Sequence, residues 1–322
     1  MNPLVTSLIA SSRHRLAPYP RFTIPLASNT IPSNDSITAT FTRNSSATYI
    51  DANGVLQTAG IDVPRFQNGR YLCEPSGTNL LIQSGTPATQ VITVSSGTSY
   101  TVQCYGSGSI TLSGAGSGTV VEGTSKTFTA SSTSLIWAIS GSLSRAQVET
   151  GTQATSYIPT TTAPVTRAAD VLHYTVGDVI TQGQGSLYCE FIGWVSSSSI
   201  RVVLALSDGS NSNRVYAYIS TTGLINAEVT IAGSYSSGVY TSSYISSSNN
   251  KFLITYNTSQ FTMYLNGVLV ATRSNIALPT TPNTVSAGCT PVGQYQLNNE
   301  IGNIKYFKEA LTEAEAIKLT TL

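Results

Sequence analysis

The carboxylates that could act as general acids or bases are isolated from one another in the sequence. Glu190, Asp208, Glu228 and Glu300 each stand without a second acidic residue at a neighbouring strand position. Hydrolysis of a glycosidic bond requires two carboxylates about 5–10 Å apart. Asp208 is explained by its place at the start of an Asp-Gly turn in SDGSNSN. We therefore expect no catalytic residues and no enzymatic activity.

The histidines and cysteines form no pattern of nucleophilic, redox or metal-binding chemistry. His14 and His173 have no nucleophile within a recognisable motif. No phosphate-binding loop, dinucleotide fingerprint or HExxH motif occurs. Neither a CxxC pair nor metal-ligand spacing links the four cysteines, which are Cys73, Cys104, Cys189 and Cys289. We expect buried free thiols, no metal and no cofactor.

A second kind of chemistry, recognition of sugars, has several candidate residues in the C-terminal half. Lectin sites stack exposed aromatic rings on sugars and bind their hydroxyls with amides or carboxylates, often from loops. The candidates in or near Ser/Gly/Asn-rich loops are Trp194, Asp208, Asn211, Asn213, Tyr235, Tyr240 and Tyr244. The alternative is structural, because Trp194 follows a strand-like run and tyrosines are common on β-sheet surfaces.

The amino-acid composition indicates the type of secondary structure that must position these residues. Charged residues make up 10% of the 322, and 16 Lys and Arg nearly balance 15 Asp and Glu. This balance gives no electrostatic basis for binding nucleic acid or an anionic membrane. No apolar run reaches the length of about 18 residues that a membrane span needs. Low charge with abundant Ser, Thr and Tyr indicates an all-β protein.

The clearest local element is a hairpin over Lys251–Arg273, where two apolar runs flank Asn266-Gly267. Asn-Gly tolerates the positive φ angles of a tight type I′ turn. A two-residue loop pairs Leu265 with Val268, Met263 with Val270 and Phe261 with Thr272. Since both faces of this hairpin are largely apolar, we expect it in the middle of a sandwich.

The C-terminal residues predict a strand and then a short helix. Ile301–Phe307 is strand-like, and Thr312 with Glu315 has capping-box spacing. The apolar NG hairpin, the G-N-I-x-x-F strand and the A-L-T-E-A-E-A helix resemble the concanavalin A-like, laminin-G-type jelly rolls. The resemblance covers roughly residues 168–322 and implies a fold, without a function.

Two separate stretches of the sequence contain phrases of the same type. The first comprises Phe41, Thr42, Arg43, Ser45, Ala47, Thr48, Tyr49, Asp51, Gly54, Val55, Pro64, Arg65, Phe66, Glu74, Thr78, Asn79, Leu80 and Leu81. The second comprises Glu149, Ala154, Thr155, Ser156, Tyr157, Ile158, Pro159, Thr160, Thr166, Arg167, Ala168 and Asp170. Together the two phrases resemble a module of tailed-bacteriophage structural proteins. The resemblance implies a phage origin and a structural or adsorption-apparatus setting.

The N-terminus predicts an anchoring arm. Pro3 suits the first position of a helix, and Leu4, Val5, Leu8 and Ile9 then form one apolar strip at helical spacing. Four prolines within 15 residues make the next segment an extended strap. The alternative is that this segment folds back onto its own domain.

The complete prediction is an all-β chain with an extended N-terminal arm and two consecutive β-sandwich or jelly-roll domains. Residues 1–40 form the arm and 41–77 a β-hairpin and linker module. Residues 78–163 form a small β-sandwich with Trp137 in its core, and 164–322 a concanavalin A-like jelly roll.

With the phage resemblance, this architecture predicts a non-enzymatic structural component at the surface of a tailed-phage virion. A tail-associated fibre or spike is the preferred position. A capsid decoration or head-fibre protein is one alternative, and a lectin for a host-receptor glycan is another. The expected partners are other virion proteins, identical subunits in a trimer, and a host-surface glycan. Neither nucleic acid nor membrane insertion is expected.

Overall fold

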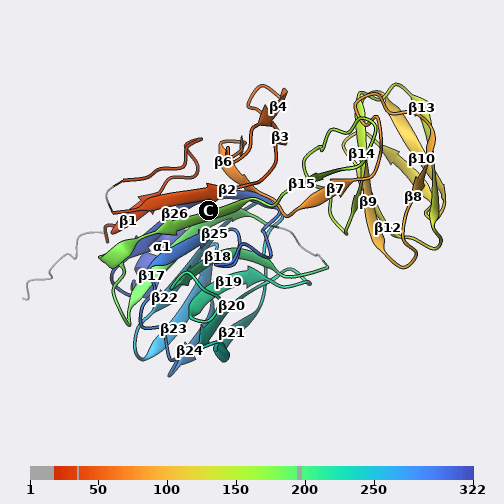
Figure 1. Cartoon of the computed structure of the whole chain (residues 1–322). Helices are drawn as coiled ribbons and strands as arrows, with labels where there is room; N and C mark the ends of the chain where they lie inside the picture. The colour runs from red at the N-terminus through yellow and green to blue at the C-terminus, as the bar shows by residue number, and fades with distance from the viewer. Residues whose placement is uncertain (1–17, 35, 194–197) are drawn as a thin grey trace, which may run out of the picture.

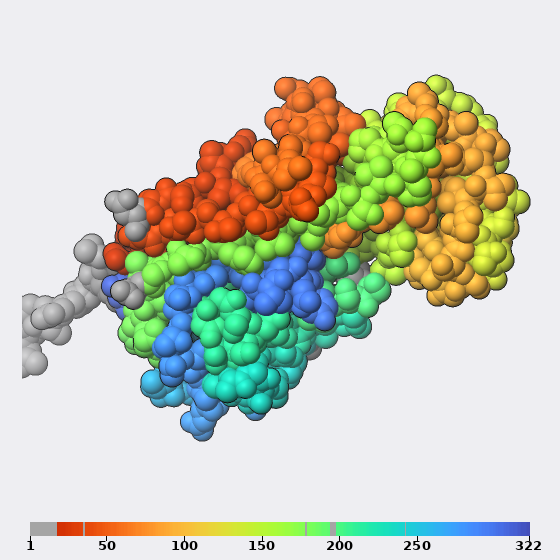
Figure 2. Space-filling model, viewed as in Figure 1, coloured from red at the N-terminus to blue at the C-terminus, as the bar shows by residue number. Residues whose placement is uncertain are grey.

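The computed structural model describes residues 18–34, 36–193 and 198–322, and nearly all of its regular structure is β-strand. Two β-sandwiches make up the fold (Figure 1). The predicted all-β sandwich class is confirmed. Figure 2 shows the smaller sandwich as a lobe that projects from the larger one.

The larger sandwich consists of two facing sheets. In the first sheet the strand order is β24 (Val268–Ser274), β23 (Gln260–Leu265), β22 (Asn249–Tyr256), β17 (Gly185–Ile192), β26 (Asn299–Phe307), β6 (Arg70–Cys73) and β5 (Phe66–Gln67), and β1 (Phe22–Ile24) also pairs with β26. In the second sheet the order is β2 (Thr38–Thr42), β16 (Val171–Thr175), β25 (Thr284–Ala287), β18 (Arg201–Ser207), β19 (Arg214–Ile219), β20 (Leu224–Ile231) and β21 (Ser234–Tyr244). A 3₁₀ turn, η1 (Gly177–Val179), follows β16.

The smaller sandwich is built from residues between these strands. One sheet contains β11 (Gly118–Val121), β10 (Gly108–Gly114), β13 (Ser134–Gly141) and β8 (Gln90–Thr93). The other contains β12 (Ser125–Thr129), β9 (Ser99–Tyr105), β14 (Arg145–Thr150), β7 (Gly77–Asn79) and β15 (Val165–Arg167). Trp137 is fully buried in its core, as predicted.

The smaller sandwich is inserted into the larger one. Strands β2, β5 and β6 belong to the two sheets of the larger sandwich and precede β7 in the chain. After β15, the chain re-enters the larger sandwich at β16, which pairs with β2. Two connections, residues 74–76 and 168–170, therefore carry the inserted sandwich. A separate hairpin of β3 (Ala47–Ile50) and β4 (Leu56–Ala59) stands beside them (Figure 1).

Part of the segment predicted as an arm lies on the protein's own body. Strand β1 pairs with β26, and Phe22 stacks on Tyr306 with ring centroids 5.4 Å apart. Ile24 and Leu26 are fully buried in the same core. For these residues the structure agrees with the alternative prediction, in which the N-terminal segment folds back onto its own domain. The predicted anchoring residues Leu4, Val5, Leu8 and Ile9 lie outside the described residues.

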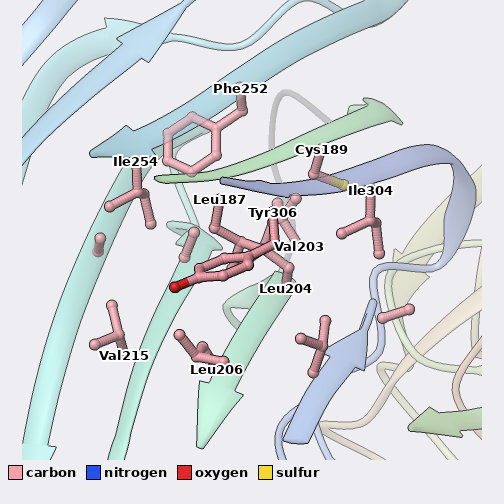
Figure 3. Close-up of a cluster of buried hydrophobic side chains, with 14 of the residues drawn as sticks. Leu187, Cys189, Val203, Leu204, Leu206, Val215, Phe252, Ile254, Ile304 and Tyr306 are labelled. Carbon is pink, nitrogen blue, oxygen red and sulfur yellow. The ribbon is translucent and has the colours of Figure 1, made fainter. Parts of the chain in front are cut away.

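Apolar side chains from the two facing sheets interdigitate to form the main core. Figure 3 shows Leu187 and Phe252 of the first sheet above Leu204 and Val215 of the second. All four cysteines are buried and free, as predicted. Because this layer is continuous, each sheet has one face sealed and one face turned outward.

The NG hairpin forms, but its register differs from the prediction. Asn266 and Gly267 have φ of 50° and 82°, as a type I′ turn requires. Leu265 pairs with Val268, but a bulge then places Met263 opposite Ala271 instead of Val270. The expectation that both strands lie inside the sandwich is wrong for β24. It is an edge strand, and Val268 is 59% exposed.

The C-terminal helix covers the outer face of the first sheet. Helix α1 (Glu313–Thr320) begins with the predicted capping box between Thr312 and Glu315. Ala316 and Leu311 pack with Tyr188, Leu253 and other side chains on the outer face of that sheet. The corresponding face of the second sheet has no such helix among the described residues.

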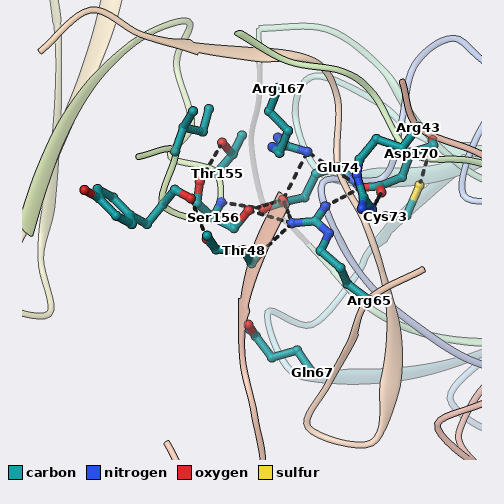
Figure 4. Close-up of polar contacts among 12 residues, drawn as sticks. Arg43, Thr48, Arg65, Gln67, Cys73, Glu74, Thr155, Ser156, Arg167 and Asp170 are labelled. Atoms are coloured by element: carbon teal, nitrogen blue, oxygen red, sulfur yellow. Dashed lines mark hydrogen bonds and ion pairs between the residues drawn. The ribbon is translucent and has the colours of Figure 1, made fainter. Parts of the chain in front are cut away.

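A buried ionic cluster joins the two connections of the inserted sandwich (Figure 4). We call its members, Arg43, Arg65, Glu74, Arg167 and Asp170, the ionic clamp. Asp170 bonds Arg43 at 3.0 Å and also pairs with Arg65. Glu74 lies 2.7 Å from Arg65 and 3.3 Å from Arg167. Every member belongs to one of the two phrases, so residues far apart in sequence meet here.

Backbone contacts reinforce the ionic clamp. The amide of Asp170 donates to the carbonyl of Glu74 at 2.9 Å, and the amide of Glu74 donates to the Asp170 carboxylate at 3.0 Å. Arg167 donates to the carbonyl of Pro75 at 2.7 Å. Burial tends to raise the pKa of Glu74, but Arg167 and Arg65 lower it to about 2. The clamp therefore holds both connections side by side.

Candidate functional site

The outward face of the second sheet carries a compact group of tyrosines around one carboxylate. Tyr216 and Tyr218 come from β19, Glu228 from β20, and Tyr235 and Tyr240 from β21. We call these five residues the tyrosine face. Alternating residues of β19 and β20, among them Val215, Ala217, Ala227 and Val229, point inward to the core. The tyrosine face therefore lies on the side of the sheet turned away from the core.

Strand register brings these side chains together. Tyr216 is directly opposite Glu228, and Glu228 is directly opposite Gly238. On the next outward row, Tyr218 and Tyr240 both pair with Asn226. Directly opposed and diagonal positions on one sheet face are within reach of long side chains.

A β-bulge in β21 turns Tyr235 toward the same side. Tyr235 and Tyr240 are five positions apart, so a regular strand would place them on opposite faces. The pairing shifts between Val229 and Thr230, leaving Ser236 as the extra residue. The hydroxyl of Tyr240 consequently lies 3.3 Å from that of Tyr235.

Three tyrosine hydroxyls converge on Glu228. Those of Tyr216, Tyr218 and Tyr240 donate to its carboxylate at 2.6, 2.8 and 2.9 Å. Burial and then the bond to Glu228 raise the pKa of Tyr216 and of Tyr218. The pKa of Tyr240 is raised by burial, by Tyr235 and by Glu228. All three hydroxyls thus remain protonated donors near neutral pH.

Two rings form the floor of this face and two project from it. Tyr216 and Tyr218 are buried and stack with centroids 5.3 Å apart. Tyr235 and Tyr240 are 57% and 55% exposed. Gly238 leaves room for them, because a Cβ there would lie 2.8 Å from Cζ of Tyr240 and 2.9 Å from the Tyr235 hydroxyl. Glycine at this position therefore lets the rings lie close to the strand.

Arg214 adds a cation at the edge of the face. Its guanidinium carbon lies 4.1 Å from the centroid of the Tyr216 ring. The same guanidinium donates to Oδ1 of Asn211 at 2.5 Å. One predicted sugar-binding residue of the β18–β19 loop is thereby linked to the tyrosine face.

The other predicted sugar-binding residues have different positions. Asp208 accepts hydrogen bonds from Ser210 and Asn213, and the Ser210 bond is the main cause of its lowered pKa. This carboxylate organises its own turn, as the Asp-Gly interpretation predicts. Tyr244 is exposed at the other end of β21, opposite Leu224. Trp194 lies outside the described residues.

The sequence named Tyr235, Tyr240 and Asn211 as sugar-binding candidates, but it did not indicate that four further residues surround them. Tyr216, Tyr218, Arg214 and Glu228 come from regular strands or their ends, whereas the search concentrated on loops. The alternating pattern R-V-Y-A-Y-I could have indicated two tyrosines on one strand face. Their convergence on Glu228 depends on strand pairing, which no local pattern predicts.

The remaining acid–base groups form no complete catalytic arrangement among the described residues. Nδ1 of His173 lies 3.0 Å from Oγ of Ser286, but Ser286 is fully buried and no carboxylate bonds this histidine. Glu190 accepts from Tyr188, and Glu300 from Asn68. In the described ranges, no three His, Cys, Asp or Glu side chains are grouped to hold a metal. No helix there has the length and apolar character of a membrane span.

Rings that project beside hydroxyl donors, a carboxylate and a guanidinium suit a hydroxylated ligand. Tyrosine offers an apolar ring for stacking and a polar hydroxyl at its tip. Glu228 and Arg214 supply acceptor and donor groups beside the rings. Because the site is a shallow sheet face, it fits a ligand bound from one side.

Comparisons with known proteins give no family for this chain. No family model and no curated protein matches it. Among solved structures, the CBM40 domain of the Ruminococcus gnavus IT-sialidase, bound to α2,3-sialyllactose, matches with 17% identity and a TM-score of 0.37. That match covers 44% of this chain and 84% of the domain.

Two other matches are similarly distant. The NanB sialidase of Streptococcus pneumoniae has 18% identity and a TM-score of 0.39, over 45% of this chain and 25% of the sialidase. A heptameric SAP-like pentraxin from Limulus polyphemus has 14% identity and a TM-score of 0.32, over 42% of this chain and 69% of its own. Identities and TM-scores this low assign neither family nor function. The chain is accordingly described by its β-sandwich fold and by the geometry of its own tyrosine face.

Proposed function

We propose that this chain is a non-enzymatic glycan-binding protein and that the tyrosine face is its binding site. The observation that carries the proposal is the pair of exposed rings, Tyr235 and Tyr240, held beside the carboxylate of Glu228. This face belongs to the sheet whose outer side is free of the C-terminal helix. It is therefore accessible to a large ligand.

The geometry suits sugars because their rings combine an apolar C–H face with a rim of hydroxyls. The exposed ring of Tyr240 can stack on the apolar face while its neighbours bind hydroxyls. The floor is already ordered by hydrogen bonds to Glu228, so few side chains need to be fixed on binding. A pre-organised aromatic surface of this kind favours binding.

Binding without hydrolysis is proposed because the face contributes one carboxylate. Glycoside hydrolysis uses a pair of carboxyl groups on either side of the scissile bond. Both oxygens of Glu228 accept hydrogen bonds from tyrosines, which fix the group in the floor of the site. Its role here is to orient the tyrosine rings and hydroxyls.

The test is an array of glycans probed with the full chain, followed by calorimetry on the strongest ligand. A Tyr235→Ala/Tyr240→Ala variant is expected to bind at least tenfold more weakly, a change of about 1.4 kcal/mol. Tyr240→Phe, which keeps the ring, should lose less glycan affinity than the double variant. Tyr19→Ala is the matched control, since Tyr19 is also exposed but precedes β1 of the first sheet. Equal binding by the double variant, or no bound sugar on the array, would refute the proposal.

A second proposal concerns the setting, which we place at the surface of a tailed-phage particle. It is supported by the resemblance of the two phrases, of which Arg43, Arg65, Glu74, Arg167 and Asp170 meet in the ionic clamp. A tail fibre or spike is the preferred position, as a trimer, and a capsid decoration or head fibre is the alternative.

This setting is tested by deleting residues 1–17, which precede the segment packed on the larger sandwich. The shortened protein should keep the thermal stability of the full chain but fail to join particles, as measured by mass spectrometry of purified virions. Incorporation at the normal level would contradict the predicted anchoring role of Leu4, Val5, Leu8 and Ile9.

A further inference from the structure

A second cleft, separate from the tyrosine face, lies where three parts of the chain meet. Its volume is about 360 Å³, within the range of about 300–1,000 Å³ typical of small-molecule sites. The β3–β4 hairpin forms one wall, the inserted sandwich another, and the start of β26 a third. None of its lining residues belongs to the tyrosine face.

Arg145 lines this cleft with its guanidinium held against aromatic rings. Its guanidinium carbon lies 4.0 Å from the centroid of Tyr105 and 5.9 Å from that of Tyr157. Its Nε is buried without a hydrogen-bond partner. Across the described residues, no carboxylate forms an ion pair with Arg145, whereas Arg43, Arg65 and Arg167 all have such partners.

An arginine in this state is suited to bind an anion. The half-buried guanidinium has no carboxylate partner among the described residues, so its charge is available to an incoming anion. Its planar fork matches the two oxygens of a carboxylate, and the tyrosine ring beneath it fixes the orientation of that fork. The aromatic support thus prepares Arg145 for a bidentate contact.

The other charge in the cleft is already neutralised. The carboxylate of Glu74 lies 2.7 Å from Arg65 and 3.3 Å from Arg167, and it accepts from Ser156. Arg145 therefore supplies the uncompensated charge of the described lining, and that charge is positive. Arg145 would attract an incoming anion. The carboxylate of Glu74, which would repel that anion, is compensated by Arg65 and Arg167.

The remaining polar lining consists mainly of amides and hydroxyls. Gln67, Gln103 and Asn299 contribute amides, and Tyr49 and Ser125 contribute hydroxyls. Gln67 already accepts from the amide of Ile50, and Gln103 donates to the carbonyl of Thr155, so both are held in place. These amides and hydroxyls can form hydrogen bonds with the hydroxyls of a ligand.

We propose that the cleft binds an acidic sugar unit, a hexuronate, with its carboxylate on Arg145 and its hydroxyls toward the amide-lined walls. The site draws residues from the hairpin, the inserted sandwich and the larger sandwich. It therefore depends on the ionic clamp that holds these parts together. Its ligand class is defined by charge as well as by hydroxyls, unlike that of the tyrosine face.

The test is ligand-observed NMR and calorimetry of the full chain with D-glucuronate, using D-glucose and inorganic phosphate as matched probes. Glucuronate should bind at least tenfold more tightly than either probe. Arg145→Met should weaken it at least tenfold, and Arg145→Lys, which keeps the charge but loses the fork, should fall between. Absence of glucuronate binding, equal binding of phosphate, or no effect of Arg145→Met would overturn the proposal.

Two further variants distinguish ligand binding in the cleft from effects on folding and from binding at the tyrosine face. Ser125→Trp places a bulky side chain at the cleft while Arg145 is retained, and it should also weaken glucuronate binding at least tenfold. Tyr240→Ala should leave glucuronate binding unchanged, so the two sites can fail independently. Arg145→Met should remain folded, as its melting temperature will show, because methionine can still pack on the Tyr105 ring. Loss of glucuronate binding in Tyr240→Ala, or normal binding in Ser125→Trp, would place the ligand elsewhere.

Discussion

Replacing Asp170 by asparagine should destabilise the junction between the two sandwiches. Asp170 is fully buried and serves Arg43, Arg65 and the amide of Glu74. The ionic clamp contains three guanidiniums and two carboxylates, so its net charge is +1. Asp170→Asn raises this charge to +2 without changing the size of the side chain.

The size of the effect follows from burial. Removing one partner of a buried ion pair costs about 3–5 kcal/mol, because the opposite charge is left uncompensated. Asparagine keeps one carbonyl acceptor for Arg43 or Arg65, so we expect the lower end, about 3 kcal/mol. The loss should concentrate at the connections 74–76 and 168–170, which the clamp joins through Asp170 and Glu74.

Urea denaturation of both proteins, followed by fluorescence, measures the loss. Limited proteolysis with mass spectrometry then locates the cleavage sites, which should appear first within the two connections. Asp208→Asn is the matched control, because that carboxylate organises an exposed turn and should cost less than about 1 kcal/mol. A free energy of unfolding for Asp170→Asn within about 1 kcal/mol of the parent would refute the reasoning.

Two further predictions concern pH and the packing of the tyrosine face. Burial raises the pKa of Glu149 from 4.5 to about 7, despite hydrogen bonds from Thr155. The folded state thus retains a proton that the unfolded state loses, so stability should fall as pH rises from about 4.5 to 7, by roughly 3 kcal/mol. Glu149→Gln should abolish this slope in urea titrations at pH 5 and 8, and an unchanged slope would contradict the assignment. Gly238→Ala should displace Tyr240 and weaken glycan binding several-fold in calorimetry while the fold persists, and full affinity would show that the ring position is unimportant.

Local patterns in the sequence predict the elements whose causes are themselves local. Asn266-Gly267 forms its turn, and Thr312 with Glu315 caps the last helix, because each depends on residues a few positions apart. The burial of Trp137 also follows from alternation within one small sandwich. These features needed no knowledge of long-range pairing.

Features that depend on bulges or distant strands could not be predicted in the same way. The bulge at Val270, opposite the step from Met263 to Tyr264, shifts the hairpin register. The bulge at Ser236 turns Tyr235 onto the face of Tyr240. Insertion of the small sandwich follows from the pairing of β2 with β16, across more than a hundred residues. The two phrases contain all the residues of the ionic clamp, but their contacts depend on the folding of two connections that are distant in sequence.

The most direct test of the account is an experimental structure of the full chain with the best oligosaccharide from the array. We predict a sugar ring stacked on Tyr240 or Tyr235, with hydroxyls bonded to groups beside Glu228. A sugar bound elsewhere, with both of these rings still open to solvent, would contradict the central claim.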